Sequence, residues 1–197
     1  MRRLMVTIAA LVGLMSAFVA GPATAESSLE FILNNGGYNP DAAASGKNYT
    51  PIPREIVDYE TRERPGTIVI DSPARRLYLV LGDGKAMRYG VGVGRPGFEW
   101  GGVKTITRKA EWPSWTPPPQ MLQRRPDLPR FMAGGPKNPL GARAMYLGSS
   151  LYRIHGSNEP QTIGQAVSSG CIRMTNDDVT DLYERVNVGT KVVIIRG

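Results

Sequence analysis

The chain has 197 residues, a formal net charge of +7, one cysteine and one histidine. A single cysteine excludes an internal disulfide framework, and one histidine with one cysteine is too few ligands for the usual zinc site. The basic excess suits either an anionic partner, such as a cell wall, or a solvated surface without a partner. It includes no lysine or arginine run and no recognisable nucleic-acid motif, so we predict no nucleic-acid partner, no metal and no cofactor.

Residues 1–25 have the pattern of a cleavable signal peptide. Two arginines precede an apolar run over residues 4–20, and Ala23-Thr24-Ala25 forms a small-x-small cleavage site before Glu26. The apolar run is short for a membrane span, although a retained anchor is the alternative. We therefore expect an exported, periplasmic protein.

Residues 26–50 are small, polar and rich in glycine and asparagine, which predicts a flexible spacer. The remaining chain, residues 51–197, is long enough for one domain with a sizeable core and too short for two. A lone thiol in an exported domain is either buried and inert or kept for its chemistry.

The first half of this domain predicts short strands separated by glycine-containing turns. The segments GTIVID, RLYLVL, AMRYGVGVG and VKTITRKA are β-branched or alternating, and GDGK at residues 82–85 is typical of a tight turn. We expect these strands to form an antiparallel sheet.

Residues 111–141 differ from the rest of the domain. They hold eight of the sixteen prolines together with Trp112 and Trp115. So many prolines are incompatible with a sheet, and two tryptophans argue against disorder. We predict a packed lid or wall over a cleft, the alternative being a loop packed only on its own tryptophans.

The last third predicts a hairpin, a helix and a final buried strand. Segments 142–148 and 151–156 form the hairpin, with His155 at the end of its second strand. Residues 175–186 have acidic residues in the first turn and one apolar face, as expected of a helix. Residues 189–197 complete the domain as a strand.

His155 and Cys171 have the residue types needed for nucleophilic catalysis. A cysteine attacks as its thiolate, and a nearby histidine can take its proton. We expect Cys171 on a turn just before a helix whose dipole favours the thiolate, with the amides of Ser169, Gly170 and Cys171 forming an oxyanion hole. Gly156 and Gly170 allow the backbone to approach a substrate closely.

The residue types alone leave the alternatives open. A lone cysteine is commonly a small buried hydrophobe, and a lone histidine is commonly structural. On this basis, a catalytic pair and two unrelated structural residues remain equally compatible with the sequence.

The segment IHGSNEPQTIGQAVSSGCIRM, residues 154–174, resembles the signature of the YkuD-type L,D-transpeptidases. That signature is a histidine-glycine, a spacer, and then serine-x-glycine-cysteine followed two residues later by arginine or asparagine. Segments 53–80 and 138–148 are similar to the periplasmic ErfK-like branch, so the resemblance covers residues 51–197. One departure is FEWGGVKTI at residues 98–106, which lacks the family's Thr-Pro lead-in.

The resemblance implies a mainly β fold with two packed sheets, a short helix after the catalytic cysteine and a cleft partly covered by a loop. It implies Cys171 as the nucleophile and His155 as the base, with the Gly156 carbonyl orienting the histidine. The remaining roles that it implies are an oxyanion hole from the amides of Ser169, Gly170 and Cys171, a substrate contact from Arg173 to an acidic group of the donor stem peptide, and support of the turn by Ser168.

The implied reaction is acyl transfer through a thioester on peptidoglycan stem peptides. Cys171 attacks the carbonyl of the third stem residue, usually meso-diaminopimelate, and D-Ala leaves. The acceptor amine belongs either to another stem peptide, giving a 3→3 cross-link, or to a lysine of an envelope protein. Two alternatives remain: a peptidoglycan amidase or carboxypeptidase that uses the same cysteine, and a non-catalytic wall-binding module.

Overall fold

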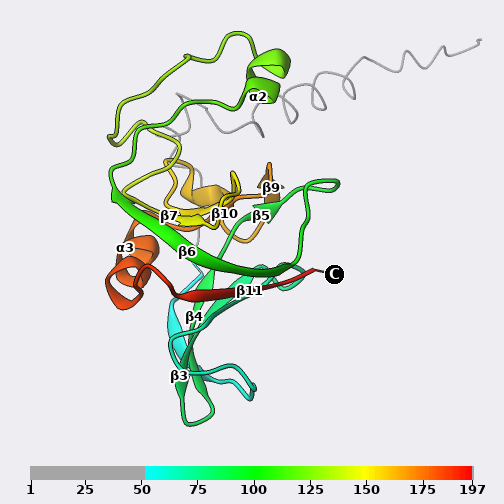
Figure 1. Ribbon diagram of the computed structural model, residues 1–197, viewed down its shortest axis with the longest axis vertical. Coiled ribbons are helices and arrows are strands. Elements are labelled where there is room, and N and C mark those ends of the chain that lie inside the picture. The colour runs from blue at the N-terminus through cyan, green and yellow to red at the C-terminus, as the bar shows by residue number, and fades with distance from the viewer. Residues whose placement is uncertain (1–51, 197) are drawn as a thin grey trace, which may run out of the picture.

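The computed structural model describes residues 52–196, so the predicted signal peptide and spacer lie outside the described residues (Figure 1). Within this range, the chain forms eleven strands, two α-helices and one 3-10 helix. In chain order they are β1 Glu55–Asp58, β2 Ile68–Asp71, β3 Arg76–Gly82, β4 Lys85–Gly90, β5 Val93–Gly94, β6 Gly102–Glu111, α2 Pro119–Arg124, β7 Arg143–Leu147, β8 Arg153–His155, η1 Pro160–Thr162, β9 Ala166–Ser168, β10 Ile172–Arg173, α3 Asn176–Arg185 and β11 Lys191–Ile195. The predicted mainly β fold is confirmed.

One long strand connects two β layers. The main sheet has nine strands in the order β1-β4-β3-β2-β11-β6-β7-β8-β10, and β5 and β9 form a separate pair. The first half of β6 pairs with β11, and its second half pairs with β7 after a register shift between Ile106 and Arg108. Such an irregularity bends a strand and increases its twist. The two predicted sheets are therefore continuous through β6 (Figure 1).

The first predicted strands pair antiparallel as expected, whereas three pairings that the sequence did not assign are parallel. The β3–β4 hairpin turns through Asp83 and Gly84, both with positive φ, as a two-residue hairpin loop requires. The pairs β2–β11, β8–β10 and β5–β9 are parallel. Parallel neighbours need a crossover connection, and the chain between them is long enough to provide one, with α3 preceding β11.

The hydrophobic core lies between the strands and α3. Ile68 and Ile70 of β2 are fully buried, and Val179 and Leu182 of α3 face the same cluster. Thr175 caps the helix, its Oγ1 accepting a hydrogen bond from the Asp178 N–H at 3.1 Å. The predicted helix and its apolar face are confirmed, and the helix seals one side of the core (Figure 1).

The proline-rich segment forms a small core of its own at one end of the molecule (Figure 1). Trp115, Leu128 and Leu140 are buried together, and Met121 of the short helix α2 packs against them. Trp115 and Met132 hydrogen-bond to each other through both backbone amides, each at 2.8 Å. This pairing holds the two arms of the segment together without a regular sheet.

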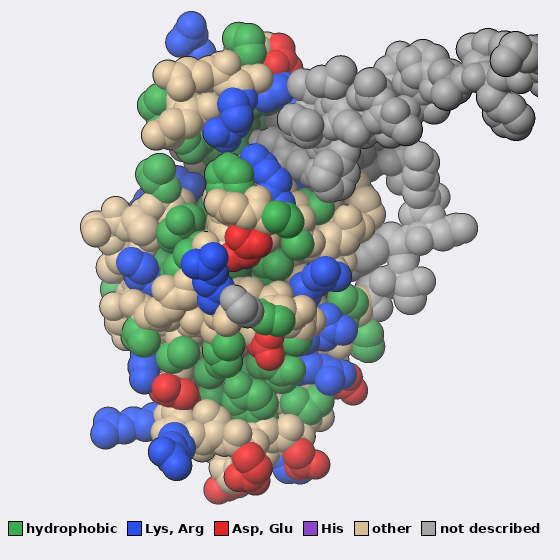
Figure 2. All heavy atoms as spheres, turned by 90° about the vertical axis from the view of Figure 1, so that its right-hand side faces the viewer, with side chains coloured by type: hydrophobic (Ala, Val, Ile, Leu, Met, Phe, Trp, Pro, Cys, Tyr) green, Lys and Arg blue, Asp and Glu red, His purple; other side chains and the backbone are tan. Residues whose placement is uncertain are grey.

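No helix within residues 52–196 is long and apolar enough to cross a membrane. Lysine and arginine side chains are spread along the whole length of the face shown in Figure 2.

Candidate active site

His155 and Cys171 come together because β8 and β10 are neighbours. The two strands pair in parallel, with Ile172 opposite Ile154 and Arg173 opposite His155. His155 ends β8, and Cys171 immediately precedes β10. Both side chains line the same cavity, which has a volume of about 520 Å³.

The proline-rich segment supplies one wall of this cavity, as predicted. Trp115, Pro118, Met121 and Leu140 line it from that side, opposite the strands that carry the histidine and the cysteine. The small core around Trp115 therefore holds an apolar wall in front of Cys171. Apolar walls with a few polar groups are typical of small-molecule and peptide sites.

The imidazole of His155 is buried and oriented by its own backbone. Its Nδ1 lies 2.5 Å from the Gly156 carbonyl oxygen. A carbonyl only accepts, so Nδ1 carries the hydrogen and Nε2 has the free lone pair. Burial, and after it the positive charges of Arg173 and Arg153, together lower the pKa of His155 to about 3, although the hydrogen bond to Gly156 acts in the opposite direction. The ring is therefore neutral at pH 7.

The surroundings of Cys171 differ from the expectation in one respect. Its thiol donates to the Leu151 carbonyl oxygen at 3.7 Å. The expected helix dipole is absent, because β10 and the capping Thr175 separate the cysteine from α3 by about 13 Å of extended chain. A helix dipole acts only near the first turn, so α3 cannot stabilise a thiolate at this position.

The turn before the cysteine is closed by Ser168. Its Oγ donates to the Cys171 carbonyl oxygen at 2.6 Å and accepts from the Gly170 N–H at 3.1 Å. Gly170 has a φ of +101°, which an L side chain rarely adopts. The Gly170 amide, one of the three expected oxyanion-hole donors, is therefore already bonded within the turn.

Arg173 lies in the interior, paired with an acidic residue that the sequence did not single out. Its Nη1 is 2.9 Å from Glu159 Oε2, and their side chains are 7% and 5% exposed. Arg173 also lines the catalytic cavity. Arg173 is therefore a buried charge, and part of its hydrogen-bonding capacity is used within the protein.

Two aromatic residues that sequence reasoning missed hold the turn before Cys171. The Trp100 Nε1–H donates to the Gly170 carbonyl oxygen at 2.7 Å, and its ring stacks on Tyr152 with centroids 4.2 Å apart. A Cβ on Gly170 would lie 2.5 Å from the Tyr152 ring, so the turn fits tightly against it. No local signal connects these residues, because they come from three distant parts of the chain.

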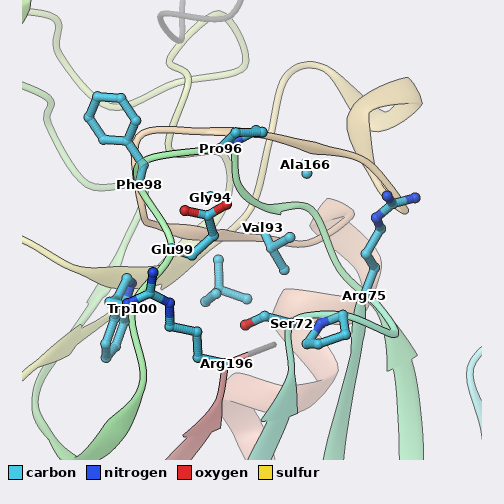
Figure 3. A pocket seen from close by; sticks show the side chains of 12 residues that line it. Ser72, Arg75, Val93, Gly94, Pro96, Phe98, Glu99, Trp100, Ala166 and Arg196 are labelled. Atoms are coloured by element: carbon cyan, nitrogen blue, oxygen red, sulfur yellow. The ribbon is translucent and has the colours of Figure 1, made fainter.

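A second cavity of about 340 Å³ is lined by residues of β5, β9 and β10 (Figure 3). Ile172 lines it, whereas the preceding Cys171 lines the catalytic cavity. Arg75 and Arg196 reach it from opposite sides, and Phe98 points away from its centre. Phe98 lines both cavities and therefore lies between them.

Within residues 52–196, no three histidine, cysteine, aspartate or glutamate side chains are grouped so that they can hold a metal ion.

Comparison with known families gives a match over most of the described chain. Residues 65–194 match the YkuD model, described as the L,D-transpeptidase catalytic domain. The chain is 41% identical over 160 residues to "Probable L,D-transpeptidase ErfK/SrfK" of Escherichia coli K12, covering 77% of this chain and 50% of that protein. It is 36% identical over 153 residues to "Probable L,D-transpeptidase YbiS" of the same strain, covering 73% and 48%. The chain thus spans about half the length of these curated relatives.

Solved structures show the same fold at lower identity. An L,D-transpeptidase from Mycobacterium smegmatis superposes with a TM-score of 0.54 at 18% identity, covering 66% of this chain and 58% of that chain. The avibactam carbamoyl enzyme of Ldtfm has the same TM-score and identity, covering 68% and 50%.

Proposed function

The chain belongs to the YkuD family of L,D-transpeptidase catalytic domains, and from this premise we propose that it is a peptidoglycan L,D-transpeptidase. The observation that carries the proposal is the placement of His155 and Cys171 on paired strands of one cavity, with the His155 Nδ1–H engaged by Gly156. The imidazole is neutral and its Nε2 is free to accept a proton, as a general base must be.

In the first half-reaction, the thiol turns from Leu151 toward His155 as the donor binds. His155 Nε2 takes the thiol proton while Cys171 Sγ attacks the carbonyl carbon of the third stem residue, meso-diaminopimelate. The N–H groups of Ser169 and Cys171 stabilise the oxyanion. The bond to D-Ala breaks, the imidazolium returns its proton to the departing amine, and a thioester remains.

In the second half-reaction, an acceptor amine attacks the thioester carbon. A new amide bond forms, the carbon–sulfur bond breaks, and the proton of the amine returns through His155 to the thiolate. The acceptor is either the side-chain amine of another stem peptide or a lysine of an envelope protein. The leader-like residues 1–25 and the substrate class together support action in the periplasm.

Ser168 and Arg173 have supporting roles in this proposal. Ser168 holds the turn that presents the nucleophile, and Arg173 lines the cavity while paired to Glu159. With Glu159 balancing its charge, Arg173 meets an acidic group of the donor through the donors that the pair leaves unused.

The proposal is tested by mass spectrometry of the purified protein with a disaccharide tetrapeptide and a free amine acceptor. We expect an acyl-enzyme adduct on Cys171, release of D-Ala and an amine-exchanged product. Cys171→Ala, which removes only the sulfur, should form none of these while it retains its fold.

The other outcomes identify the alternatives. Tripeptide as the only product means that water takes the acyl group, so the protein is a hydrolase. Absence of any adduct on the wild-type protein, in the presence of both substrates, contradicts an enzymatic role. A carbapenem gives an independent measurement, since its mass should add to the wild type and not to Cys171→Ala.

A further inference from the structure

The charged side chains described around the catalytic cavity are all positive. Within the described residues, Arg124, Arg153 and Arg173 line it, and no aspartate or glutamate does. Glu159 balances Arg173 in a buried ion pair, so that charge is compensated from inside the protein. The excess positive charge at the cavity therefore comes from the other arginines.

Arg124 is the arginine placed to meet a substrate. It is the last residue of α2, on the apolar wall that faces Cys171, and its side chain is exposed. Within residues 52–196 it makes no ion pair, and its contact is with the Phe98 ring, 5.9 Å from the guanidinium carbon to the ring centroid. An exposed guanidinium on the rim of a cavity is available for a bidentate carboxylate.

A second guanidinium faces the same ring. Arg95 lies 4.2 Å from the Phe98 centroid, and its Nη1 donates to Ser169 Oγ at 3.2 Å. The two distances to the ring together limit the separation of the Arg95 and Arg124 guanidinium carbons to about 10 Å, close to one Debye length at physiological salt. Burial lowers the pKa of Arg95, and the charges of Arg124 and Arg173 lower it further, which is consistent with close positive groups.

The sequence builds this arrangement through a tight turn. The Phe98 N–H donates to the Arg95 carbonyl oxygen at 2.8 Å, and Gly97 has a φ of +84°. Proline at the second position and a glycine of positive φ at the third are the signature of a type II turn. The turn fixes Arg95 beside Phe98, where its guanidinium reaches Ser169, two residues before the nucleophile.

We propose that Arg124 and Arg95, whose guanidinium groups both face the Phe98 ring, form a subsite that binds a carboxylate of the acyl-donor peptide. This rests on the proposed function and names the substrate class in more detail: a peptide with a free carboxylate near the acylated residue, preferred over the same peptide with that group amidated. Arg124 lines the wall, whereas Arg95 lies outside the cavity lining and contacts two residues that line it, Phe98 and Ser169, so a bound carboxylate joins the wall to the turn before Cys171.

The test pairs an enzyme variant with a change in the substrate. Arg124→Gln and wild type are compared on tetrapeptide donors in which each carboxylate in turn is free or amidated. We expect the wild type to prefer one free carboxylate by about five- to tenfold in kcat/KM, through KM, and Arg124→Gln to lose that preference. Arg124→Lys, which keeps the charge without the bidentate geometry, should retain part of it. Arg130→Gln, an exposed arginine of the same segment outside the cavity lining, is the matched control and should behave as wild type.

A binding measurement separates this inference from the proposed function. The dissociation constants of the same donors are measured by calorimetry on Cys171→Ala, with and without Arg124→Gln. Carboxylate selectivity that depends on Arg124 supports the subsite even if the wild type shows no turnover, in which case only the proposed activity fails. Equal selectivity with and without the arginine, for every carboxylate tested, overturns the subsite.

Discussion

The buried imidazole of His155 predicts a loss of stability in mild acid. The unfolded chain binds a proton at His155 with a pKa near 6.5, whereas burial lowers the folded pKa to about 3. Between these values, the unfolded state binds more protons than the folded state, so the free energy of unfolding falls as the pH falls. The stabilising contribution is fully present above pH 6.5 and is lost progressively toward pH 3.

The magnitude follows from the two pKa values. Each pH unit below 6.5 costs about 1.4 kcal/mol while the folded imidazole remains neutral. Between pH 7 and pH 5, His155 alone should therefore remove about 2 kcal/mol from the free energy of unfolding. That is a large fraction of the stability of a domain of this size.

Urea unfolding at pH 7, 6 and 5 measures this effect, with His155→Asn as the comparison. Asparagine can still donate to the Gly156 carbonyl but cannot be protonated in this range. Other groups titrate in both proteins, including Asp178, whose pKa burial raises, so they cancel in the difference. The wild type should lose about 2 kcal/mol more than His155→Asn between pH 7 and pH 5. Parallel pH dependences would refute the reasoning, because they mean that the folded imidazole titrates as an exposed one.

Three substitutions, with Gly189→Ala as a control, test the contacts that hold the turn before Cys171 and the buried ion pair of Arg173. Gly170→Ala places a Cβ 2.5 Å from a tyrosine ring at a φ of +101°, so it should lower the free energy of unfolding by about 1–3 kcal/mol and remove most acylation activity. The control Gly189→Ala has a similar φ of +95° but nothing within 4 Å of the new Cβ. It should lower the free energy of unfolding less and leave acylation unchanged. Trp100→Phe keeps the stacking but removes the donor to Gly170, and should slow acylation about tenfold in a single-turnover assay with a stability change of about 1 kcal/mol. Glu159→Gln removes the counter-charge of the buried Arg173, although the amide oxygen can still accept its hydrogen bond, and should lower the free energy of unfolding by about 3 kcal/mol in urea. An unchanged midpoint means that the charge of Glu159 does not stabilise the fold.

The sequence alone determined the features that depend on near neighbours in the chain. The alternation in the strands, the GDGK turn and the capped helix after Met174 are local patterns, and each appears in the structure. A shared site for His155 and Cys171 was implied by the resemblance of residues 154–174 to a family signature, because the residue types alone left the pairing open.

The tertiary structure decided which distant groups meet around that pair. The bend in β6 and the parallel pairing of β8 with β10 bring together segments whose order in the chain does not specify a register. The Trp100 contact with Gly170, the Glu159 partner of Arg173 and the approach of Arg124 to Phe98 each join residues from different elements. Each depends on how separate elements pack, and packing energy is a property of the folded core that no short window of residues contains.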